Sequence, residues 1–336
     1  METKYKTALA AYKNLQISEL YTIKPHVIGV GSFGAVMLCK VKNSTDICVA
    51  KIVNFDNNKH KNATNILKKE VDIYRTLSSF KKIRPFLVKM YSLVNFQNNA
   101  LQACQALITD YAGKDLDKIL KDKGQYAFSI YQLLKIGMNL IPALEAIHSC
   151  NIVHRDIKPA NIVLRLSKSR NIFNVKLIDY GLATTWNATK EPTRMKRGAG
   201  TPRFCAWKQH FGFNGSPCRD MESLIYTLIY LSGTKLPWHG LKISNLKHKT
   251  RTIGYTKRDA SSSVLCSKFD AQYLQDDAST ATTTYTSLGQ ILDIIRLAKY
   301  SDLPDYKKIN EYFKKSLDRS TESDSFSSNS ISCPNP

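Results

Sequence analysis

A small set of polar residues lies in an order that suits phosphoryl transfer from a magnesium-bound nucleotide. Lys51 ends a strand-like run, Glu70 follows in a helix-like pattern, and Asp156, Asn161 and Asp179 come later. Such a transfer needs a cation on the phosphates, a carboxylate to hold that cation, a base and metal ligands. We therefore expect ATP and Mg²⁺ as cofactors, with Lys51, Glu70 and Asp156 as catalytic residues and Asn161 and Asp179 as metal ligands.

The stretch from His154 to Asn161, which reads HRDIKPAN, is the strongest signal in the chain. Asp156 is expected to accept or orient the proton of a substrate hydroxyl, and Lys158 to lie beside the γ-phosphate. General-base assistance contributes roughly 10²–10⁴-fold, so the loss of Asp156 should raise the barrier by about 3–5 kcal/mol. Asp179 opens the triplet Asp-Tyr-Gly after an apolar run, as expected of a metal carboxylate at the end of a buried strand.

The glycine pattern Gly29-x-Gly31-x-x-Gly34 is weak evidence on its own. A dinucleotide-binding turn leads into a helix, whereas here a strand-like run follows at 35–41. A glycine loop between antiparallel strands can cover nucleotide phosphates, and an ordinary glycine-rich hairpin is the alternative. The residues expected to contact the nucleotide in this part of the chain are Ile28, Gly29, Gly31, Ser32, Phe33, Gly34, Val36, Ala50 and Lys51.

A lysine within an apolar strand is costly to bury unless a partner compensates its charge. Glu70 can supply that partner, and Asp72 is the alternative carboxylate on the same predicted helix. The competing interpretation makes Lys51 an edge residue that reaches solvent and Glu70 an ordinary surface charge.

The distribution of apolar residues predicts an α+β fold with two lobes. Residues 21–109 indicate a small β-rich lobe with one main helix, and residues 115–316 a larger, mainly helical lobe after a connector at 110–114. Residues 1–20 are expected to form a helical N-terminal extension of undetermined packing. Residues 250–285 are expected to form a partly mobile Ser/Thr-rich insertion that interrupts the helices, and residues 317–336 a disordered Ser-rich tail.

The formal net charge of +22 favours acidic partners, which include phosphorylated protein segments, nucleic acid and anionic lipid. No apolar run reaches the length that crosses a bilayer, so no membrane span is expected. The eight cysteines contain no Cys-x-x-Cys pair, which argues against a zinc site and for free thiols in a reducing compartment. We expect a cytoplasmic or nuclear location.

Taken together, these motifs resemble the eukaryotic protein kinase superfamily over about residues 20–316. The Ala-Pro-Glu triplet common in these enzymes is missing, and Gly200-Thr201-Pro202-Arg203-Phe204 stands in its place. With the runs that begin at Cys218, Leu236 and Leu303, this is similar to the casein kinase 1 family, which includes the tau-tubulin and vaccinia-related branches. The resemblance implies a two-lobed kinase fold and a Ser/Thr protein kinase that phosphorylates acidic or pre-phosphorylated proteins.

The resemblance also assigns roles to individual residues. Thr201 matches the residue that contacts the catalytic aspartate and lysine. Thr109 matches the back of the adenine pocket, and the backbones of Asp110 and Ala112 match the groups that bind the adenine edge. A basic cluster that recognises an acidic or phosphorylated residue of the substrate corresponds to Arg203, Lys247 and Lys249.

Other functions compatible with the sequence are a pseudokinase that acts as a scaffold, and a kinase of the vaccinia-related type associated with nucleic acid. The filled catalytic positions argue against the pseudokinase, and no base-reading motif supports direct nucleic-acid recognition. We expect a monomer, and activity without phosphorylation of the activation segment.

Overall fold

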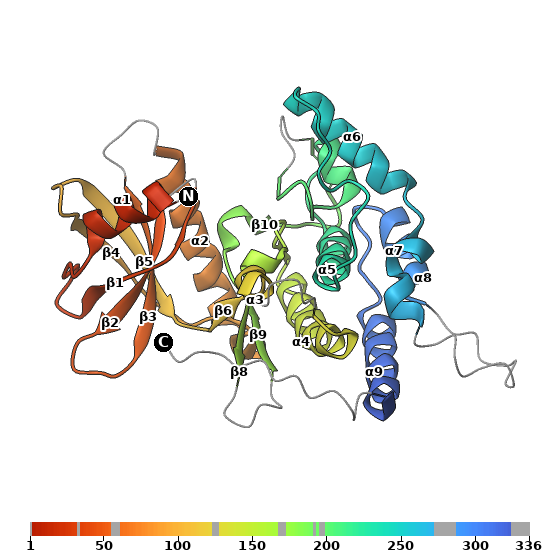
Figure 1. The fold of residues 1–336 in the computed structure, drawn as a ribbon, viewed down its shortest axis with the longest axis horizontal. Helices are drawn as coiled ribbons and strands as arrows, with labels where there is room; N and C mark the ends of the chain where they lie inside the picture. The colour runs from red at the N-terminus through yellow and green to blue at the C-terminus, as the bar shows by residue number, and fades with distance from the viewer. Residues whose placement is uncertain are drawn as a thin grey trace, which may run out of the picture. The chain divides into compact units, whose positions relative to one another are not determined.

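A computed structural model, drawn in Figure 1, describes residues 2–31, 34–54, 61–122, 128–166, 173–190, 193–194, 199–271 and 287–323. Its contacts separate two compact units, residues 1–112 with 179–181 and residues 113–178 with 182–336. The boundary after Ala112 falls inside the predicted connector. Within the described residues, no helix is both long and apolar enough to cross a bilayer.

The first unit is built on an antiparallel sheet with the strand order β1-β2-β3-β5-β4. Its strands are β1 (Tyr21–Val30), β2 (Ala35–Val41), β3 (Ile47–Asn54), β4 (Met90–Gln97) and β5 (Ala103–Asp110). The unit also holds the helices α1 (Glu2–Tyr12) and α2 (Lys61–Ser79) and the 3₁₀ turn η2 (Lys81–Phe86). β-Branched residues on both sides of the turn at Asn43, which has a φ of 57°, favour the β2–β3 hairpin.

Helix α1 packs on one face of this sheet. Alternate residues of β2, β3 and β5, such as Met37, Ala50 and Ala106, form one buried cluster with Ala8 and Tyr12 of α1. The predicted N-terminal extension is therefore helical over Glu2–Tyr12 but not over residues 13–20, and it contributes to the core of the first unit. Its last turn is capped from the β4–β5 turn, where Asn99 donates its backbone NH to Ala11 O and its Nδ2 to Ala10 O, both at 3.0 Å.

Helix α2 packs against β3 and β5. Its buried residues Leu67, Val71, Tyr74 and Leu77 recur at the spacing of one helical face. Because side chains alternate across a strand, the β3 residues that face away from the α1 cluster, Lys51 among them, are available to α2. This alternation places Lys51 where a carboxylate on α2 can reach it.

The second unit is mainly helical. Its helices are α3 (Leu116–Asp122), α4 (Ile130–His148), α5 (Pro217–Leu231), α6 (Leu246–Asp259), α7 (Ser262–Asp270), α8 (Leu288–Leu297) and α9 (Tyr306–Ser323). Short strands pair as β6 (Lys114–Asp115), β8 (Ile162–Leu166) and β9 (Phe173–Leu177), and as β7 (Ile152–Val153) with β10 (Thr184–Thr185). Short 3₁₀ turns lie at η3 (Pro159–Asn161) and η5 (Trp207–Phe211). The predicted α+β class, with a β-rich part before a helical one, is confirmed.

The prediction of a Ser/Thr-rich insertion at 250–285 is wrong up to residue 271. Helices α6 and α7 occupy most of this stretch and bury Ile253, Leu265 and Phe269. The hydroxyl groups fit these helices because Ser261 caps α7 and Thr252 and Thr256 donate to carbonyls one turn earlier. Residues 272–286 lie outside the described part of the chain.

The predicted start of the tail at 317 is also too early, because α9 continues to Ser323. Ser316 and Ser320 are buried, and their hydroxyls donate to Tyr312 O and Leu317 O of the same helix. A serine whose hydroxyl is satisfied in this way packs like a small apolar residue, which composition alone does not indicate. Residues 324–336 lie outside the described residues.

Candidate active site

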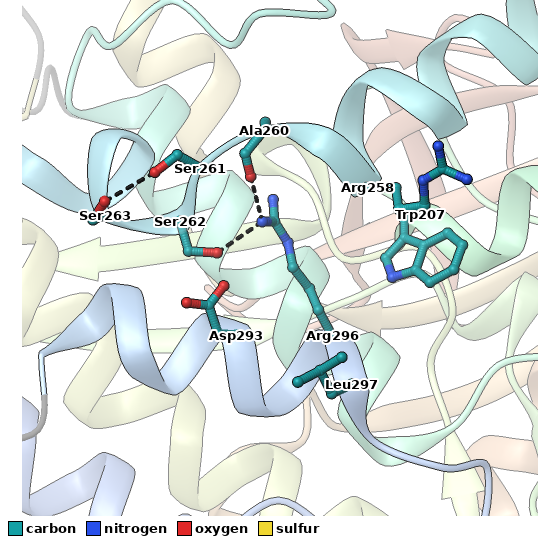
Figure 2. Close-up of a pocket in the computed structure, with 9 residues that line it drawn as sticks. All are labelled: Trp207, Arg258, Ala260, Ser261, Ser262, Ser263, Asp293, Arg296 and Leu297. Carbon is teal, nitrogen blue, oxygen red and sulfur yellow. Dashed lines mark hydrogen bonds between the residues drawn. The ribbon is translucent and has the colours of Figure 1, made fainter.

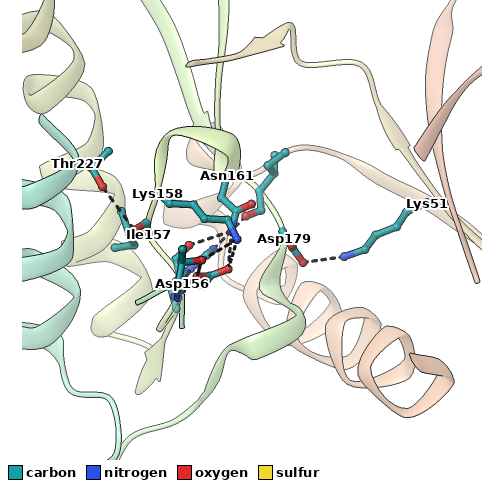
Figure 3. A network of polar contacts seen from close by, with 10 residues as sticks. Lys51, Asp156, Ile157, Lys158, Asn161, Asp179 and Thr227 are labelled. Carbon is teal, nitrogen blue, oxygen red and sulfur yellow. Dashed lines mark hydrogen bonds and ion pairs between the residues drawn. The ribbon is translucent and has the colours of Figure 1, made fainter. Parts of the chain in front are cut away.

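Lys51, Glu70 and Asp179 form the polar centre of the first unit. Lys51 Nζ lies 2.6 Å from Glu70 Oε2 and 2.7 Å from Asp179 Oδ1, and Figure 3 shows the contact with Asp179. The Glu70 side chain is 2% exposed, whereas those of Lys51 and Asp179 are 28% and 40% exposed. The predicted pair of Lys51 with Glu70 is therefore present, and Asp72, which is 72% exposed and lies 3.6 Å from Arg75, is not its partner.

The charges of this centre are set by burial and by pairing. Burial lowers the pKa of Lys51, but the carboxylates of Glu70 and Asp179 more than offset this and raise it above its ordinary value. Burial raises the pKa of Glu70, and Lys51 opposes that effect. Lys51 is thus held as a cation beside a carboxylate that solvent hardly reaches, as an interaction with phosphate oxygens requires.

Asp179 has a φ of 66°, which is uncommon for a residue with a side chain. The next residue, Tyr180, is fully buried and its ring meets that of Tyr74 edge-on, with centroids 5.1 Å apart. Gly181 follows, and a Cβ there would lie 2.9 Å from Ile66 Cγ2. Strained backbone of this kind persists where its surroundings hold it, and it is concentrated at functional sites.

The glycines between β1 and β2 differ in what the fold requires of them. At Gly34 a Cβ would lie 1.8 Å from Ile52 O, so packing against β3 excludes a side chain. At Gly29 and Gly31 a Cβ would meet nothing within 4 Å. Packing in this structure therefore does not require a glycine at either position, and their predicted role as nucleotide contacts stays a prediction. Ser32 and Phe33, predicted as nucleotide contacts, lie outside the described residues.

The strand register corrects one predicted nucleotide contact. Ala50 is fully buried in the cluster that includes α1, on the face opposite Lys51, so the assignment of Ala50 to the nucleotide site is wrong. Val49 shares the face of Lys51 and is the better candidate, and counting by two from Lys51 would have found it. Val36 pairs with Lys51 and Thr109 with Val49, so both lie in the same part of the sheet.

The remaining predicted contacts of the first unit lie at the ends of strands. Ile28 and Gly29 are part-buried near the end of β1. Asp110 ends β5, and its backbone NH donates to Lys89 O at 2.8 Å. Ala112 is the last residue of the main segment of this unit.

In the second unit, Asp156 receives hydrogen bonds on both carboxylate oxygens (Figure 3). Thr201 donates its backbone NH and its Oγ1 to Oδ1 at 2.9 and 2.8 Å. Lys158 Nζ lies 2.6 Å from Asp156 Oδ2, and both residues are labelled in Figure 3. Asn161 Nδ2 donates to Oδ2 at 3.2 Å and to the Asp156 carbonyl at 2.9 Å. The structure thus brings together all four residues predicted here, and Lys158 also donates to Thr201 Oγ1 at 3.1 Å.

The backbone of this loop is held from beneath by Asp220, which sequence reasoning did not assign to the site. Asp220 accepts the backbone NH groups of His154 and Arg155 at 2.6 and 2.8 Å and contacts His148 Nε2 at 3.1 Å. Burial raises the pKa of Asp220, but the contacts with His148 lead the effects that lower it below its ordinary value. Its position in the run Cys218-Arg219-Asp220 was the available signal.

Magnesium is compatible with the donors that this chain offers. Mg²⁺ prefers oxygen ligands and is usually bound by one or two carboxylates together with substrate phosphates. Asp179 supplies a carboxylate, and the Asn161 amide uses its nitrogen for the hydrogen bonds to Asp156, which leaves its oxygen for a metal. Within the described residues, no group of three or more His, Cys, Asp or Glu could hold a metal ion.

Of the predicted substrate-recognition residues, Arg203 has a side chain held by specific contacts. Its Nη2 lies 2.9 Å from His239 Nε2, and its guanidinium lies over the ring of Tyr230 at 5.2 Å. Burial, Arg203 and Lys235 lower the pKa of His239, so this imidazole is neutral and accepts from Arg203. Lys247 is exposed and Lys249 half-buried on the first turns of α6. His239 was missed, although it follows Trp238 in a run that carries the family resemblance.

A cavity of about 440 Å³ lies elsewhere in the second unit, between η5, the α6–α7 connection and α8. Figure 2 shows Arg296 among the residues that line it, and its Nη1 donates to Ala260 O and to Ser262 Oγ, both at 2.7 Å. None of the predicted site residues lines this cavity. It is therefore separate from the catalytic loop.

Comparison with protein families relates the chain to a known domain. The family described as Protein kinase domain matches residues 22–290, which is well over half of the chain.

Proposed function

Because the chain belongs to the protein kinase domain family, we propose that it is a serine/threonine protein kinase of the casein kinase 1 type. It transfers the γ-phosphate of ATP to Ser or Thr residues of acidic or already phosphorylated proteins. The observation that carries this proposal is the arrangement of Lys158 and Thr201 around Asp156. In this arrangement a lysine follows the catalytic aspartate at a distance of two residues, and a threonine contacts both.

The residues around Asp156 can orient a substrate hydroxyl. Four donor groups fix the carboxylate of Asp156, so the hydroxyl of a peptide serine would meet an acceptor whose orientation is already set. Lys158 places a positive charge within 2.6 Å of that acceptor, where it can stabilise charge on the transferred phosphoryl group. A bound Mg²⁺–ATP supplies that group and neutralises part of its charge.

The preference for acidic or phosphorylated substrates rests on Arg203 and on the charge of the chain. A guanidinium suits bidentate binding of phosphate or carboxylate, and that of Arg203 is held by His239 and the Tyr230 ring. The net charge of +22 adds a long-range attraction for such substrates. Lys247 and Lys249 remain proposed members of this recognition site.

The test uses labelled ATP and a set of matched peptides. The peptides carry Ser, Thr or Tyr as acceptor, each with a neutral, an acidic or a phosphorylated residue upstream. We expect transfer to Ser and Thr, a higher kcat/KM for the acidic and phosphorylated peptides, and loss of transfer in Asp156→Asn. Arg203→Gln should remove the upstream preference while transfer to the neutral peptide continues.

Transfer to Tyr alone would overturn the Ser/Thr assignment, and equal rates on all upstream residues would overturn the casein kinase 1 type. A wild-type protein that binds ATP but transfers nothing would support the alternative of a scaffold. The net charge also favours a second function, association with nucleic acid; an affinity for duplex DNA that falls steeply with salt would support it. We further propose a monomer that acts in the cytoplasm or nucleus.

A further inference from the structure

Lys257 is a buried cation in the second unit for which the catalytic arrangement gives no role. It lies in the last turn of α6, and none of its surface is exposed. Its Nζ donates to Pro202 O at 2.8 Å and to Cys205 O at 2.5 Å, and it lies over the rings of Tyr226 and Trp238 at 5.2 and 5.1 Å.

The stretch that Lys257 contacts follows directly after Thr201. Within it the backbone NH groups of Phe204 and Cys205 both donate to Thr201 O at 2.9 Å, which forms a tight turn. Trp238 Nε1 donates to Arg203 O at 2.8 Å. Side chains from α6 and from the segment after α5 therefore hold three carbonyls of this turn, those of residues 202, 203 and 205.

At its other end the same turn reaches the catalytic aspartate. Thr201 donates twice to Asp156 Oδ1. Gly200, the residue before it, has a φ of 94°, and a Cβ at this position would lie 2.5 Å from Arg155 O, so a side chain does not fit there. Bonds thus run from Lys257 through Pro202 and Cys205 to Thr201 and on to Asp156. A shift of the turn would be passed to the Asp156 carboxylate.

Stability alone does not explain a lysine at this position. Burial lowers the pKa of Lys257 to about 8, so the site disfavours the cation. Its charge is compensated there by the carbonyls of Pro202 and Cys205, so the position suits a lysine because of its contacts with this turn. The Ala-Pro-Glu triplet, which usually anchors this segment of a kinase, is missing from the chain, so another anchor is needed.

We propose that Lys257 is a positioning residue that anchors the turn 202–205 and, through Thr201, sets the orientation of Asp156. The proposal rests on the proposed kinase function. It assigns to α6 a role in catalysis although Lys257 itself does not touch the reacting groups. Trp238 contributes to the same anchor through Arg203 O.

The test compares Lys257→Met with Lys268→Met. The control also removes a lysine whose Nζ donates to a carbonyl of the second unit, Ser232 O at 3.0 Å, but that carbonyl is not in the turn. Displacements of about 1 Å at a reacting group can cost 10²-fold, so we expect kcat of Lys257→Met to fall about 10- to 100-fold, with the KM for ATP within about 2-fold. Lys268→Met should retain wild-type kcat. Lys257→Met leaves the buried Cys205 O without this donor, so its melting temperature should fall by several degrees, and kcat is measured well below that transition.

A double variant that combines Lys257→Met with Thr201→Ala distinguishes a purely structural role of Lys257 from the positioning role. If Lys257 acts through Thr201, the double variant is no slower than Thr201→Ala alone, because the connection is already cut. Multiplied losses in the double variant, or a kcat of Lys257→Met within about 2-fold of wild type, would overturn the proposal. If Lys257→Met does not fold, Trp238→Phe provides the same test, with a smaller loss of kcat that is again absent in the Thr201→Ala background.

Failure of the proposed function is recognised separately. A wild-type protein without any transfer activity refutes the function, and hydrogen exchange of the peptide covering 199–206 then decides the anchor. Faster exchange in Lys257→Met than in Lys268→Met supports the anchor, and equal exchange overturns it.

Discussion

The Lys51–Glu70 pair allows a matched test on a single helix. Glu70→Gln keeps the size and one acceptor of the side chain but removes its charge. Asp72→Asn makes the same chemical change two residues later. Glu70 is 2% exposed and lies 2.6 Å from Lys51, whereas Asp72 is 72% exposed and lies 3.6 Å from Arg75. Any difference between the variants therefore reports burial and the lysine contact rather than the loss of a negative charge on α2.

The expected loss of kcat/KM in Glu70→Gln depends on the contacts that Lys51 keeps. Asp179 still contacts Lys51 at 2.7 Å, but its side chain is 40% exposed, so solvent screens this pair more than the one with Glu70. A hydrogen bond to a charged group contributes about 1.5–3 kcal/mol. If the misplaced Lys51 stabilises the transition state less by this energy, kcat/KM falls about 10- to 150-fold. An exposed pair such as Asp72–Arg75 contributes about 0–1 kcal/mol, so Asp72→Asn should lower kcat/KM by less than about 5-fold.

The assay is steady-state transfer of labelled phosphate to one peptide at several ATP concentrations, with thermal unfolding recorded for each variant. Unchanged melting temperatures would assign the loss in Glu70→Gln to the site. If Asp72→Asn loses as much as Glu70→Gln, or if Glu70→Gln keeps more than half of the wild-type kcat/KM, then Glu70 is not the group that positions Lys51.

Further predictions concern stability and regulation. Burial lowers the pKa of His210 to about 3. An unfolded histidine titrates near pH 6.5, so the stability that neutral His210 contributes is complete above that pH and is lost as the pH falls towards 3. The loss amounts to about 2 kcal/mol by pH 5. Denaturant unfolding of His210→Gln should lack this loss, and an unchanged pH slope would contradict it. At Gly137 a Cβ would lie 2.2 Å from Phe313 Cε1. Gly137→Ala should therefore lower the free energy of unfolding by about 1–3 kcal/mol, whereas Gly29→Ala, with open space, should change it by less than about 0.5 kcal/mol. Arg155 already donates to Leu182 O and Asn214 Oδ1, both at 2.8 Å, so its guanidinium is held without a phosphate on the activation segment. Phosphatase-treated protein should therefore keep its activity, and loss of turnover would refute this.

The sequence predicted those parts of the site where residue type and spacing are both restrictive. Lys51, Glu70 and Asp179 meet in one unit, and Asp156, Lys158, Asn161 and Thr201 meet in the other, as their motifs indicate. The α+β class and the α4 helix could be read from strand alternation and helical spacing. Such patterns record burial and backbone geometry directly, so one chain is enough to recognise them.

Other parts failed because composition was used in place of position. Ser and Thr residues at 250–271 suggested a loop, yet they cap or line helices whose buried faces are set by Ile253 and Phe269. Ala50 was included among the nucleotide contacts together with Lys51, although neighbours in a strand point to opposite faces. His239 and Asp220 contact their partners through tertiary structure, at separations of 36 and 65 to 72 residues, which no local pattern contains.

The basic charge of the chain shows why position matters for partners as well. Lys257 falls in α6, whose sequence reads as a basic surface helix, but it lies four residues after buried Ile253 and so on the same face. Arg155, Arg219 and Arg296 are likewise buried. These cations hold carbonyls, rings and hydroxyls of the second unit, and they are not available to an acidic partner. Among the described residues the buried carboxylates of Glu70, Asp156, Asp220 and Glu222 balance these four cations, so burial does not lower the net charge of the exposed groups, and the proposed recognition of acidic substrates depends on where the exposed cations lie.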